Sequence, residues 1–462
     1  MKNPSSYFLW TVGCQMNIAD SEKLAAGFTR LGLNETKTMD DATIVVINTC
    51  SIRQHAEDRA YSQLGRVRLQ KEKRPDLKVA VMGCMVGPKT GDLKRRFPFV
   101  DTFARPQDFE PIIELIEGDE NDLGGEFWPT TWSIPNGPTA YVPVVHGCDK
   151  FCTYCIVPYR RGRERSRPVN EIVREVNWLT NNGAREVTLL GQTVEAFGRD
   201  LTDSSEDSPD LGDLMRELSD LPELKRIRFL TSYPKHMTER ILKAVADLPK
   251  VMECFSLPIQ SGSDRILSEM RRGYELKEFR EKINLVRSLM PDAGISTDII
   301  VGYPGETEKD FQDSLDVLRE FRFDKVHIAA YSERPGTIAA RTTTDDITVE
   351  EKSERLQRTE ALSEQIGREK NAALLGSTQP VLIEGSRDDQ FYGRTCSGKL
   401  VHIDVPVRIG EIVDVVIEHT GSYSLRGQPV DTLEALTIRG THTFFSKFNH
   451  ISLNPRITWL DP

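Results

Sequence analysis

Three cysteines on one short loop are the residues in this sequence best suited to chemistry. Cys148, Cys152 and Cys155 form a C-x3-C-x2-C run in a chain of 462 residues. Thiolates are the usual ligands of iron–sulfur clusters, and three of them can hold three corners of a four-iron cluster. The fourth iron would then lack a protein ligand and keep an open coordination position. A structural zinc site needs four closed ligands, so a zinc site completed by His146 or by a distant residue is the alternative.

Three further cysteines each follow a short apolar run with the length of a buried strand. They are Cys14, Cys50 and Cys84, and the runs before them cover residues 7–12, 43–47 and 78–82. Helix-like segments such as 20–33 separate the runs, which predicts βαβ units and a parallel sheet. Parallel strands end at one edge of a sheet, where α/β proteins bind ligands. The three thiols can therefore meet there as a second metal site, or they are small buried core residues.

Five arginines follow the cysteine run, with a single acidic residue, Glu164, among them. They are Arg160, Arg161, Arg163, Arg165 and Arg167. The net charge of −10 argues against a generally basic nucleic-acid-binding protein, but phosphate contacts depend on local Lys and Arg. So much like charge beside a candidate metal site predicts an anionic partner. A solvated face is the alternative.

The composition excludes several classes of protein. Hydrophobic residues make up 38% of the chain, and no apolar run approaches the about 20 residues needed to span a bilayer. The apolar segment after the first residues is too short for a secretory signal. Eight cysteines in a chain of this size do not form a disulfide scaffold. We therefore expect a cytoplasmic protein without a membrane segment, in which clustered cysteines bind metal or act in catalysis.

Two more domains are predicted after the first α/β region. Six strand-like runs alternate with helices such as 169–181 and 276–288, which predicts an incomplete eightfold βα barrel with the cysteine loop after its first strand. A charged helix over 349–375 then precedes short runs between glycines, which predicts a small β-barrel. The first set of strands is expected at 142–146, 186–190, 226–231, 253–257, 295–301 and 325–331, and the second at 380–384, 400–403, 411–417 and 435–438. A Gly- and Pro-rich linker is expected over 121–138.

The motifs around both sets of cysteines resemble a known family. Tyr154 extends the run to C-x3-C-x-aromatic-C, and the strand-end cysteines lie in Gly-Cys-Gln-Met-Asn, Asn-Thr-Cys-Ser-Ile-Arg and Met-Gly-Cys-Met. With Arg-Gly-Arg-Glu-Arg-Ser-Arg after the run, they resemble the radical S-adenosylmethionine (SAM) methylthiotransferases that modify tRNA. The resemblance implies two 4Fe-4S clusters. One lies at the C-x3-C-x2-C run, where its open iron binds SAM, and an auxiliary one lies at the three strand-end cysteines.

Pattern and resemblance together predict an α/β protein of three domains. The first is a Rossmann-like parallel-sheet domain at 5–121, and the second a radical SAM core, built as a partial (βα)6 barrel, at 134–366. The third, at 369–440, is a small β-barrel resembling TRAM, an RNA-binding domain. Residues 371–440 carry six basic and nine acidic residues. Contacts with RNA from individual Arg and aromatic side chains are therefore expected there instead of broad phosphate binding.

A bound SAM needs polar groups at the carboxyl ends of the barrel strands. The candidates, each of which can also be an ordinary cap or turn residue, are Tyr154, Gly191, Gln192, Ser232, Gln260 and Asp298. The sequence departs from the family at Thr193, where Asn is usual, and at Phe255, where His is common. These departures bear on contacts with cofactor and substrate but not on the clusters. The candidates for contact with tRNA phosphates are Arg161, Arg163 and Arg165.

Within the family, the motifs resemble the branch that acts on N6-dimethylallyladenosine beside the anticodon. That branch implies a reaction in two stages. The reduced cluster at the C-x3-C-x2-C run cleaves SAM to methionine and a 5′-deoxyadenosyl radical, which removes hydrogen from C2 of the adenosine. The auxiliary cluster supplies sulfur, and a second SAM supplies the methyl group.

Three alternatives remain at this point. The chain could methylthiolate threonylcarbamoyl-adenosine in tRNA or an aspartate of a ribosomal protein, or it could be a non-catalytic, metal-stabilised RNA-binding module. The partners that the resemblance implies are the anticodon stem-loop of tRNA, an electron donor such as flavodoxin or ferredoxin, and a sulfur or iron–sulfur carrier. The chain is expected to be a monomer.

Overall fold

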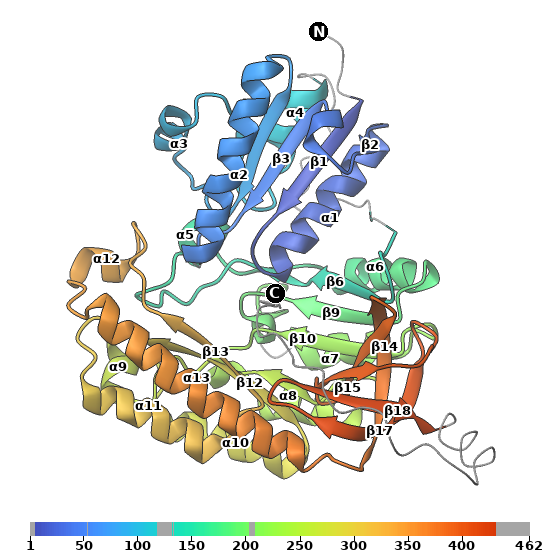
Figure 1. Ribbon diagram of the computed structural model, residues 1–462, viewed down its shortest axis with the longest axis vertical. Helices are drawn as coiled ribbons and strands as arrows, with labels where there is room; N and C mark the ends of the chain where they lie inside the picture. The colour runs from blue at the N-terminus through green and yellow to red at the C-terminus, as the bar shows by residue number, and fades with distance from the viewer. Residues whose placement is uncertain (1–4, 53, 118–131, 133, 203–207, 431–462) are drawn as a thin grey trace, which may run out of the picture.

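The chain folds into three domains that follow one another along the sequence (Figure 1). The computed structural model describes residues 5–52, 54–117, 132, 134–202 and 208–430. In Figure 1 the N-terminal domain lies at the top, the central domain below it and the small C-terminal barrel at the lower right. No helix in these stretches is both long enough and apolar enough to cross a membrane. The domain boundaries given above stay predictions, and most of the predicted linker lies outside the described residues.

The N-terminal domain is a five-stranded parallel sheet with helices on both faces, as predicted. Its strand order is β2-β1-β3-β4-β5, and apolar clusters pack on each face. The central strand β3 (Ile44–Thr49) is buried along its whole length, which accounts for its nearly unbroken apolar sequence. The other strands are β1 (Ser6–Thr11), β2 (Asn34–Glu35), β4 (Lys78–Gly83) and β5 (Thr102–Ala104). The helices are α1 (Gln15–Arg30), α2 (Gln54–Lys73), α3 (Gly91–Arg96) and α4 (Glu110–Glu117), with a short 3-10 turn η1 (Met39–Asp41).

Helix α1 begins before the predicted segment 20–33. Cys14 has an extended backbone (φ −90°, ψ 176°) and stands at the N-cap of α1, the conformation usual for that position. At the other end the helix stops at Arg30, because Gly32 has a positive φ of 79° and turns the chain. The first turn of α1 therefore starts directly at the carboxyl edge of the sheet, beside the first candidate ligand.

The central domain contains six parallel strands that form the predicted partial barrel. They divide into two three-stranded sheets, β6-β9-β10 and β11-β12-β13, joined by a parallel bridge between Ile227 and Val251. The strands are β6 (Thr139–Pro143), β9 (Glu186–Leu190), β10 (Arg226–Leu230), β11 (Cys254–Ser256), β12 (Gly294–Val301) and β13 (Lys325–Ala330). The last five begin and end within about one residue of the predicted strands, since each is an apolar run between clear breaks.

The prediction of the first barrel strand at 142–146 is wrong. Strand β6 ends at Pro143, and β7 (Val145–His146) leaves the barrel to pair antiparallel with β8 (Arg165–Ser166). Pro143 has no backbone N–H and interrupts the ladder at this point. The cysteine loop therefore lies inside a hairpin whose two short strands are β7 and β8.

Helices cover the outside of the central strands and pack their apolar faces into one continuous core. They are α5 (Val157–Arg161), α6 (Val169–Asn181), α7 (Leu211–Ser219), α8 (Glu239–Asp247), α9 (Asp264–Glu269), α10 (Leu276–Leu289), α11 (Glu308–Phe321), α12 (Ile338–Thr342) and α13 (Val349–Ala372). Two 3-10 turns, η2 (Val194–Ala196) and η3 (Pro234–His236), follow β9 and β10. Helix α13 is the predicted charged helix, ending three residues earlier than expected.

The C-terminal domain is the predicted small closed barrel. Its strand order is β14-β15-β16-β18-β17, and its interior holds apolar side chains from β14, β16, β17 and β18. The strands are β14 (Thr378–Arg387), β15 (Gln390–Thr395), β16 (Leu400–Ile403), β17 (Ile412–Thr420) and β18 (Ser424–Pro429). Strands β15 and β18 were not predicted, because their mostly polar sequences contain no apolar run. The strand predicted at 435–438 lies outside the described residues.

The small barrel covers the amino ends of the central strands. Arg226, the first residue of β10, donates to Glu186 of β9 (2.5 Å), to Glu384 of β14 (3.2 Å) and to the carbonyl of Arg394 in β15 (2.6 Å). The side chains of Arg226 and Glu186 are buried and that of Glu384 is half-buried. The cysteine loop lies beyond the opposite, carboxyl ends of the strands (Figure 1). Residues at the amino end of a βα barrel usually serve stability, and Arg226 fits that role.

Replacing Arg226 with Met would leave the buried Glu186 without its ion-pair partner, while the half-buried Glu384 would keep Arg394 (3.4 Å). We expect Arg226→Met to lose about 3–5 kcal/mol of unfolding free energy, the usual cost of removing one side of a buried ion pair. Arg216→Met on α7 is the matched control, because Arg216 pairs with Asp213 at a partly exposed position and such pairs contribute about 1 kcal/mol or less. Urea unfolding of both variants measures the difference. Equal losses would contradict a stabilising role for the Arg226 network.

Candidate metal centres and the surrounding site

The cysteine loop is closed by hydrogen bonds of its own backbone. The amide of Cys148 donates to the carbonyl of Gly162 (3.1 Å), and the amide of Cys155 donates to the carbonyl of Cys152 (3.0 Å). The amide of Asp149 donates to the carboxylate of Glu164 (3.1 Å). These contacts tie the loop to the chain on both sides of α5. They hold the three cysteines on one short segment at the carboxyl edge of the barrel.

The thiols of this loop are largely withdrawn from solvent. Cys148 and Cys152 are buried and Cys155 is half-buried. Burial raises the pKa of Cys148 to about 12 and also raises the pKa of Cys155. The metal-binding form of cysteine is the thiolate, so a bound cation has to displace the proton from each sulfur. Buried thiols with raised pKa values are unreactive as free nucleophiles, so the metal site predicted at this loop stays the chemical role that suits these residues.

Arg272 is a residue of this site that the sequence analysis missed. It follows α9, and its Nη1 lies 3.4 Å from the Cys152 sulfur and 3.4 Å from the Tyr154 hydroxyl. Its Nη2 donates to the carbonyl of Pro258 (2.7 Å), and the whole side chain is buried. Burial raises the pKa of Tyr154 well above its ordinary value, so the tyrosine stays neutral beside this cation. No spacing in the sequence connects position 272 with the cysteine run.

The structure brings the three strand-end cysteines to one edge of the sheet, with Asn17 between two of them. Cys14, Cys50 and Cys84 follow β1, β3 and β4, three neighbouring strands of the parallel sheet. The carboxamide oxygen of Asn17 lies 3.8 Å from the Cys14 sulfur and 4.0 Å from the Cys84 sulfur. Burial raises the pKa of Cys84 to about 12. These thiols meet at the sheet edge, as their parallel order requires, and are not scattered core residues.

Asn17 is itself held by the backbone of the same edge. Its side-chain amide donates to the carbonyls of Val12 (3.0 Å) and Thr49 (2.9 Å), which belong to the segments that lead into Cys14 and Cys50. The residue is fully buried. A single polar side chain therefore fixes the spacing of two of the strand ends. The motif Gly-Cys-Gln-Met-Asn contains it, but its position between the thiols is visible only in the fold.

Each group offers three thiols, which is one ligand fewer than a tetrahedral zinc site needs and the number that can hold three corners of a four-iron cluster. Among the described residues, no three Cys, His, Asp or Glu side chains are placed to hold a single ion, as a tetrahedral zinc site requires. The thiolates of a four-iron cluster bind different irons, so they need not converge on one point. Each group also has a buried arginine beside it, which suits the negative charge of a thiolate-bound cluster. The assignment of clusters to these residues stays a prediction.

The predicted SAM ligands lie at or near the carboxyl edge of the central strands. Ser232 follows β10, and its hydroxyl is buried without a hydrogen-bond partner among the described residues. Gln260 follows β11 with a positive φ of 81°, and its amide donates to the carbonyl of Asp298 (2.9 Å). Asp298 lies within β12 and not at its end. The structure thus brings Gln260 and Asp298 together and leaves the Ser232 hydroxyl available for a ligand.

The loop after β9 shows what Gly191 and Thr193 do in the fold. A Cβ at Gly191 would lie 2.4 Å from the Val145 side chain, so glycine is needed there for packing, while Gln192 beside it is half-buried. The Thr193 hydroxyl donates to Glu164 (2.8 Å), the same carboxylate that accepts from the amide of Asp149. Thr193 therefore links the β9 loop to the cysteine loop.

The second departure from the family is a core residue. Phe255 in β11 is fully buried and packs edge-on against Phe229 of β10, with ring centroids 5.6 Å apart. A polar side chain at position 255 would face the interior of the barrel in this chain. Phe255 is therefore explained by packing of the central strands, and it presents no polar group to a cofactor.

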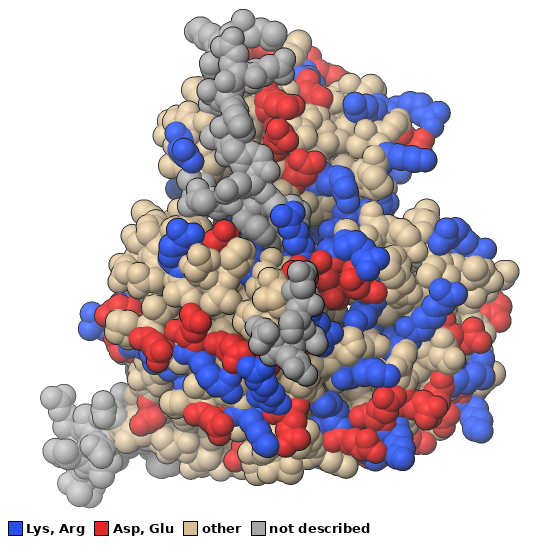
Figure 2. Space-filling view, turned by 180° about the vertical axis from the view of Figure 1, so that it is seen from behind, with Lys and Arg blue, Asp and Glu red and all other residues tan. Residues whose placement is uncertain are grey.

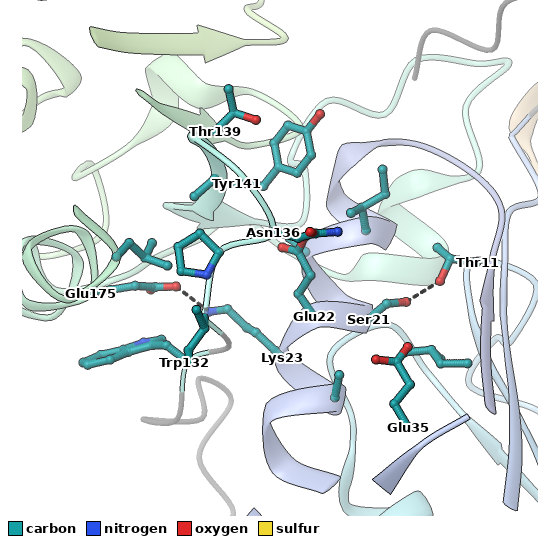
Figure 3. Close-up of a pocket in the computed structure, with 18 residues that line it drawn as sticks. Thr11, Ser21, Glu22, Lys23, Glu35, Trp132, Asn136, Thr139, Tyr141 and Glu175 are labelled. Atoms are coloured by element: carbon teal, nitrogen blue, oxygen red, sulfur yellow. Dashed lines mark hydrogen bonds and ion pairs between the residues drawn. The ribbon is translucent and has the colours of Figure 1, made fainter. Parts of the chain in front are cut away.

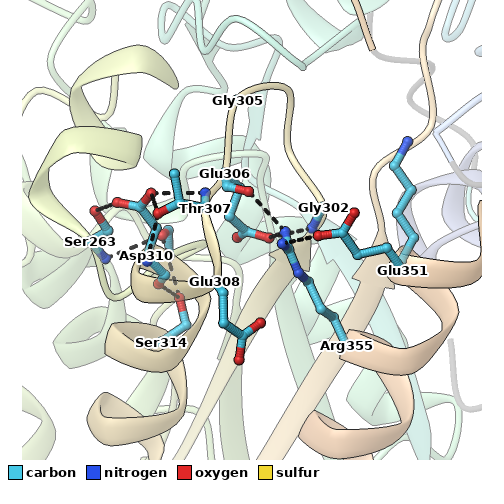
Figure 4. Close-up of polar contacts among 12 residues, drawn as sticks. Ser263, Gly302, Gly305, Glu306, Thr307, Glu308, Asp310, Ser314, Glu351 and Arg355 are labelled. Carbon is cyan, nitrogen blue, oxygen red and sulfur yellow. Dashed lines mark hydrogen bonds and ion pairs between the residues drawn. The ribbon is translucent and has the colours of Figure 1, made fainter. Parts of the chain in front are cut away.

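The loop between β12 and α11 is locked from two sides (Figure 4). Glu306 accepts from the amide of Gly302 (2.6 Å) and from Arg355 of α13 (2.7 Å). Asp310, in the first turn of α11, accepts from the Ser263 hydroxyl after β11 (2.6 Å). These contacts join the loops that follow β11 and β12 and attach both to the long helix α13. The carboxyl edge around Gln260 is therefore rigid before any ligand binds.

The three arginines predicted to contact tRNA have different environments. The Arg161 side chain is fully buried and donates to Asn17 (2.8 Å) and Asp20 (3.0 Å) of α1. It cannot reach a tRNA phosphate, which corrects the prediction for this residue. Arg163 and Arg165 are exposed on the hairpin, and Arg163 pairs with Asp149 (2.6 Å). Figure 2 shows basic side chains at the level where the N-terminal domain meets the central one, with mixed charges below.

Glu195 is a second residue of the edge that the sequence analysis missed. It lies in η2 after β9 and is 2% exposed. Neither carboxylate oxygen forms a well-aligned hydrogen bond within the described residues. Burial raises the pKa of Glu195 to about 7, and the nearby amides of Glu195 and Tyr233 oppose this only in part. A carboxyl group whose pKa lies near neutral pH is unusual, and such groups are more common at functional sites. The loop after β9 is therefore a candidate part of the polar site.

A separate cavity of about 350 Å³ lies between α1 and the β6–α6 side of the central domain (Figure 3). Its lining includes Glu22, Lys23, Trp132 and Glu175, and Lys23 and Glu175 are 3.8 Å apart. Burial lowers the pKa of Lys23 to about 8 and raises that of Glu22 to about 7. None of the six candidate cluster cysteines lines this cavity. This cavity is therefore separate from both groups of candidate cluster cysteines.

Three family models match successive parts of the chain. "Uncharacterized protein family UPF0004" matches residues 6–104, "Radical SAM superfamily" matches 142–318 and "TRAM domain" matches 372–430. The radical SAM methyltransferase TsrM of Kitasatospora setae, solved with cobalamin and a 4Fe-4S cluster, is 13% identical with a TM-score of 0.52, over 73% of this chain and 77% of that one. At that identity the likeness concerns the fold alone.

Curated relatives match this chain over nearly its whole length. A protein of Roseiflexus sp. (strain RS-1) is 43% identical over 91% of this chain and 89% of its own. A protein of Dehalococcoides mccartyi (strain CBDB1) is 42% identical over 93% and 99%, and one of Burkholderia thailandensis is 38% identical over 92% and 96%. All three bear the name tRNA-2-methylthio-N(6)-dimethylallyladenosine synthase.

The raised pKa of Glu195 predicts a pH-dependent stability. Because the folded pKa of about 7 lies above the ordinary 4.5, folding favours the protonated form, and the stability it contributes is lost as pH rises from about 4.5 through 7. We expect the unfolding free energy of Glu195→Gln, relative to that of the wild type, to rise by about 2.5 kcal/mol from pH 5 to pH 8. Urea unfolding at both pH values measures this. Glu217→Gln on the exposed face of α7 is the control, and a gain of the same size there would refute the assignment to Glu195.

Proposed function

This chain belongs to the family of tRNA-2-methylthio-N6-dimethylallyladenosine synthases, and we propose that it adds a methylthio group to C2 of N6-dimethylallyladenosine beside the anticodon of tRNA. It would act as a radical SAM transferase in the cytoplasm. The observation that carries the proposal is the presence of two separate groups of three thiols, each with two buried and one half-buried member, in a chain that aligns with these relatives over more than nine-tenths of its length. The names of the relatives favour neither threonylcarbamoyl-adenosine nor a ribosomal-protein aspartate as the substrate.

The two groups of thiols would hold the two clusters. Cys148, Cys152 and Cys155 would hold the 4Fe-4S cluster with the open iron, and the three cysteines at the edge of the N-terminal sheet would hold the auxiliary one. When bound, these groups supply the electron that cleaves SAM and the sulfur that is transferred. The residues of the chain provide the setting: Arg272 places a cation against Cys152 (3.4 Å), and Cys50, Cys84, Cys148 and Cys152 are buried.

SAM would bind at the carboxyl edge of the central strands. The Ser232 hydroxyl supports this because it is buried without a partner in the described chain, and a buried polar group of this kind is costly unless a ligand satisfies it. Gln192, Gln260 and Asp298 offer further polar groups on adjacent strands. Tyr154, next to Cys155, would contribute to the wall of the same site, where Arg272 fixes its hydroxyl.

The anticodon stem-loop would approach the exposed side of the cysteine hairpin. Arg163 and Arg165 are exposed there on the chain segment that closes the cysteine loop, so phosphates bound to them would lie beside the candidate radical site. An electron donor such as flavodoxin or ferredoxin, a sulfur or iron–sulfur carrier and a monomeric state stay predictions. The small C-terminal barrel would contribute contacts from individual side chains.

The separate locations of the two groups predict separable activities. In the Cys14/Cys50/Cys84→Ala variant we expect SAM to be cleaved to 5′-deoxyadenosine under strong reductant, while no methylthiolated nucleoside forms on tRNA. The reason is that the first group lies in its own sheet, so its loss leaves the barrel folded. Mass spectrometry of the small products and of the tRNA nucleosides measures both outcomes. The Cys148/Cys152/Cys155→Ala variant is the matched control and should lose both.

Two results would count against this proposal. Full methylthiolation by the Cys14/Cys50/Cys84→Ala variant would mean that the N-terminal thiols take no part in sulfur chemistry. Loss of SAM cleavage, with retained iron and an unchanged circular dichroism spectrum, would mean that the two groups depend on each other. Wild-type protein that leaves N6-dimethylallyladenosine in tRNA unmodified would refute the proposed substrate.

The exposed arginines predict the salt dependence of tRNA binding. Each phosphate contact that is removed lowers the slope of log K against log salt by about 1. We therefore expect Arg163→Gln/Arg165→Gln to reduce the slope by about 2 and to leave SAM cleavage without tRNA unaltered. Binding titrations at several salt concentrations provide the slopes. Arg319→Gln, at the last turn of α11, is the control, and an equal slope in the double variant and the wild type would return both arginines to an ordinary solvated surface.

A further inference from the structure

Arg161 connects the two groups of cysteines through the protein. It is the last residue of α5, the short helix that begins two residues after Cys155. Its Nη2 donates to the carboxamide oxygen of Asn17 (2.8 Å), the atom that lies 3.8 Å and 4.0 Å from the sulfurs of Cys14 and Cys84. The same nitrogen donates to Asp20 (3.0 Å). A residue of the central domain therefore enters the candidate thiol site of the N-terminal domain.

The segment around Arg161 is fitted closely into the N-terminal domain. A Cβ at Gly87, three residues after Cys84, would lie 1.9 Å from the guanidinium of Arg160. Arg105, after β5, donates to the carbonyl of Arg160 (3.2 Å). On the other side, Met16 and Ala19 of α1 pack with Leu190 at the end of β9. The position of Arg161 is thus fixed by contacts from both domains.

The guanidinium keeps donors that the protein does not use. The Nε and Nη1 atoms of Arg161 are buried and have no hydrogen-bond partner among the described residues. A buried N–H group without an acceptor is costly. The Cys84 sulfur already accepts from this guanidinium, and the sulfur atoms of a cluster at these cysteines would supply further acceptors.

The positive charge of Arg161 also favours a cluster bound at these cysteines. A cluster bound by three thiolates carries net negative charge, and one-electron reduction makes it more negative. A fixed cation in a buried site stabilises the more negative form and raises the reduction potential, because net charge and hydrogen bonds to sulfur set the potential of such clusters. Asp20, 3.0 Å from the same guanidinium, offsets part of that positive charge. The net positive charge beside the thiols is therefore smaller than that of Arg161 alone, and it would increase if Asp20 were neutral.

We propose that Arg161 is a positioning residue for the N-terminal cysteine site, where its guanidinium holds the auxiliary cluster and raises the reduction potential of that cluster. The inference rests on the proposed function, because it assumes a cluster at Cys14, Cys50 and Cys84. It replaces the earlier assignment of Arg161 to tRNA phosphates. The simpler explanation is that Arg161 only joins two domains through its ion pair with Asp20, and this explanation predicts no effect on the potential.

The test uses the full-length chain with only one cluster site. In a Cys148/Cys152/Cys155→Ala parent, reconstituted without oxygen, iron and sulfide content give cluster retention, and a redox titration followed by electron paramagnetic resonance gives the midpoint potential. We expect Arg161→Gln to lower the potential and to retain less iron than the parent. Arg161→Lys keeps the charge and should restore most of both. Asp20→Asn removes the offsetting charge and should shift the potential upward, opposite to Arg161→Gln.

Arg334→Gln is the matched control. Arg334 is also a buried arginine that joins the central domain to the N-terminal one, through Gln54 (2.8 Å) and Glu57 (2.9 Å). If such interdomain pairs act only on stability, Arg334→Gln leaves the potential where it is in the parent. Equal shifts in the Arg334→Gln and Arg161→Gln variants would overturn the inference and support the purely structural explanation.

The remaining outcomes each decide the question. Equal potentials in the parent and in Arg161→Gln, or a downward shift in Asp20→Asn, would overturn this inference while leaving the proposed function intact. If Arg161→Gln holds no iron at all, the Arg161→Lys and Asp20→Asn variants carry the test, and an unchanged potential in Asp20→Asn overturns the inference. A parent that holds no iron would overturn the proposed auxiliary cluster, and this inference with it.

Discussion

A buried guanidinium needs acceptors around it, because a charge left unpaired in the interior costs several kcal/mol. In this protein that requirement joins the domains. Arg161 and Arg334, both from the central domain, find their acceptors on α1 and α2 of the N-terminal domain. Arg226 finds one of its acceptors, Glu384, in the small barrel. The relative positions of the three domains therefore depend on a few buried ion pairs as well as on apolar packing.

This arrangement has a consequence for the candidate site. Both the N-terminal sheet and the central barrel are parallel, so each has one carboxyl edge. The first turn of α1 starts at one edge and packs with Leu190 at the other, and α5 passes from one group of cysteines toward the other. A reaction that uses a radical site and a sulfur source needs both near one substrate. Two parallel sheets that meet at their carboxyl edges satisfy that need with short loops alone.

Much of this could be read from the sequence because the signals are local. Buried parallel strands are apolar runs, so β9 to β13 were predicted within about a residue, and cysteines at strand ends predicted a shared edge. Signals that depend on contacts between distant segments could not be read. Arg272 meets Cys152 across about 120 positions of sequence, and Glu195 is unusual only because it is buried. Strands β15 and β18 lack apolar runs, since a closed barrel needs few large side chains from each strand.

The arginine run shows why composition alone misassigns residues. Five arginines in succession resemble one basic patch, but the backbone divides them. Helix α5 ends at Arg161 and directs that residue into the protein. In the two-residue strand β8 the alternation of faces exposes Arg165 and buries Ser166. Arg167 lies just beyond the strand, where the chain turns it inward against Glu175. A charge run therefore predicts a basic surface only after the local secondary structure is known.

The position of the small barrel limits how RNA can reach the site. Its contacts through Arg226 and Lys399 lie at the amino edge of the central strands. Those strands are up to eight residues long, which separates that edge from the cysteine hairpin by up to about 26 Å. An RNA stem-loop whose tip enters between the carboxyl edges has to extend along the side of the central domain to touch the small barrel at all. Residues 371–440 are acidic on balance, whereas Arg163 and Arg165 are exposed on the cysteine hairpin, so under the proposed function the hairpin would offer more positive charge to the RNA than the small barrel.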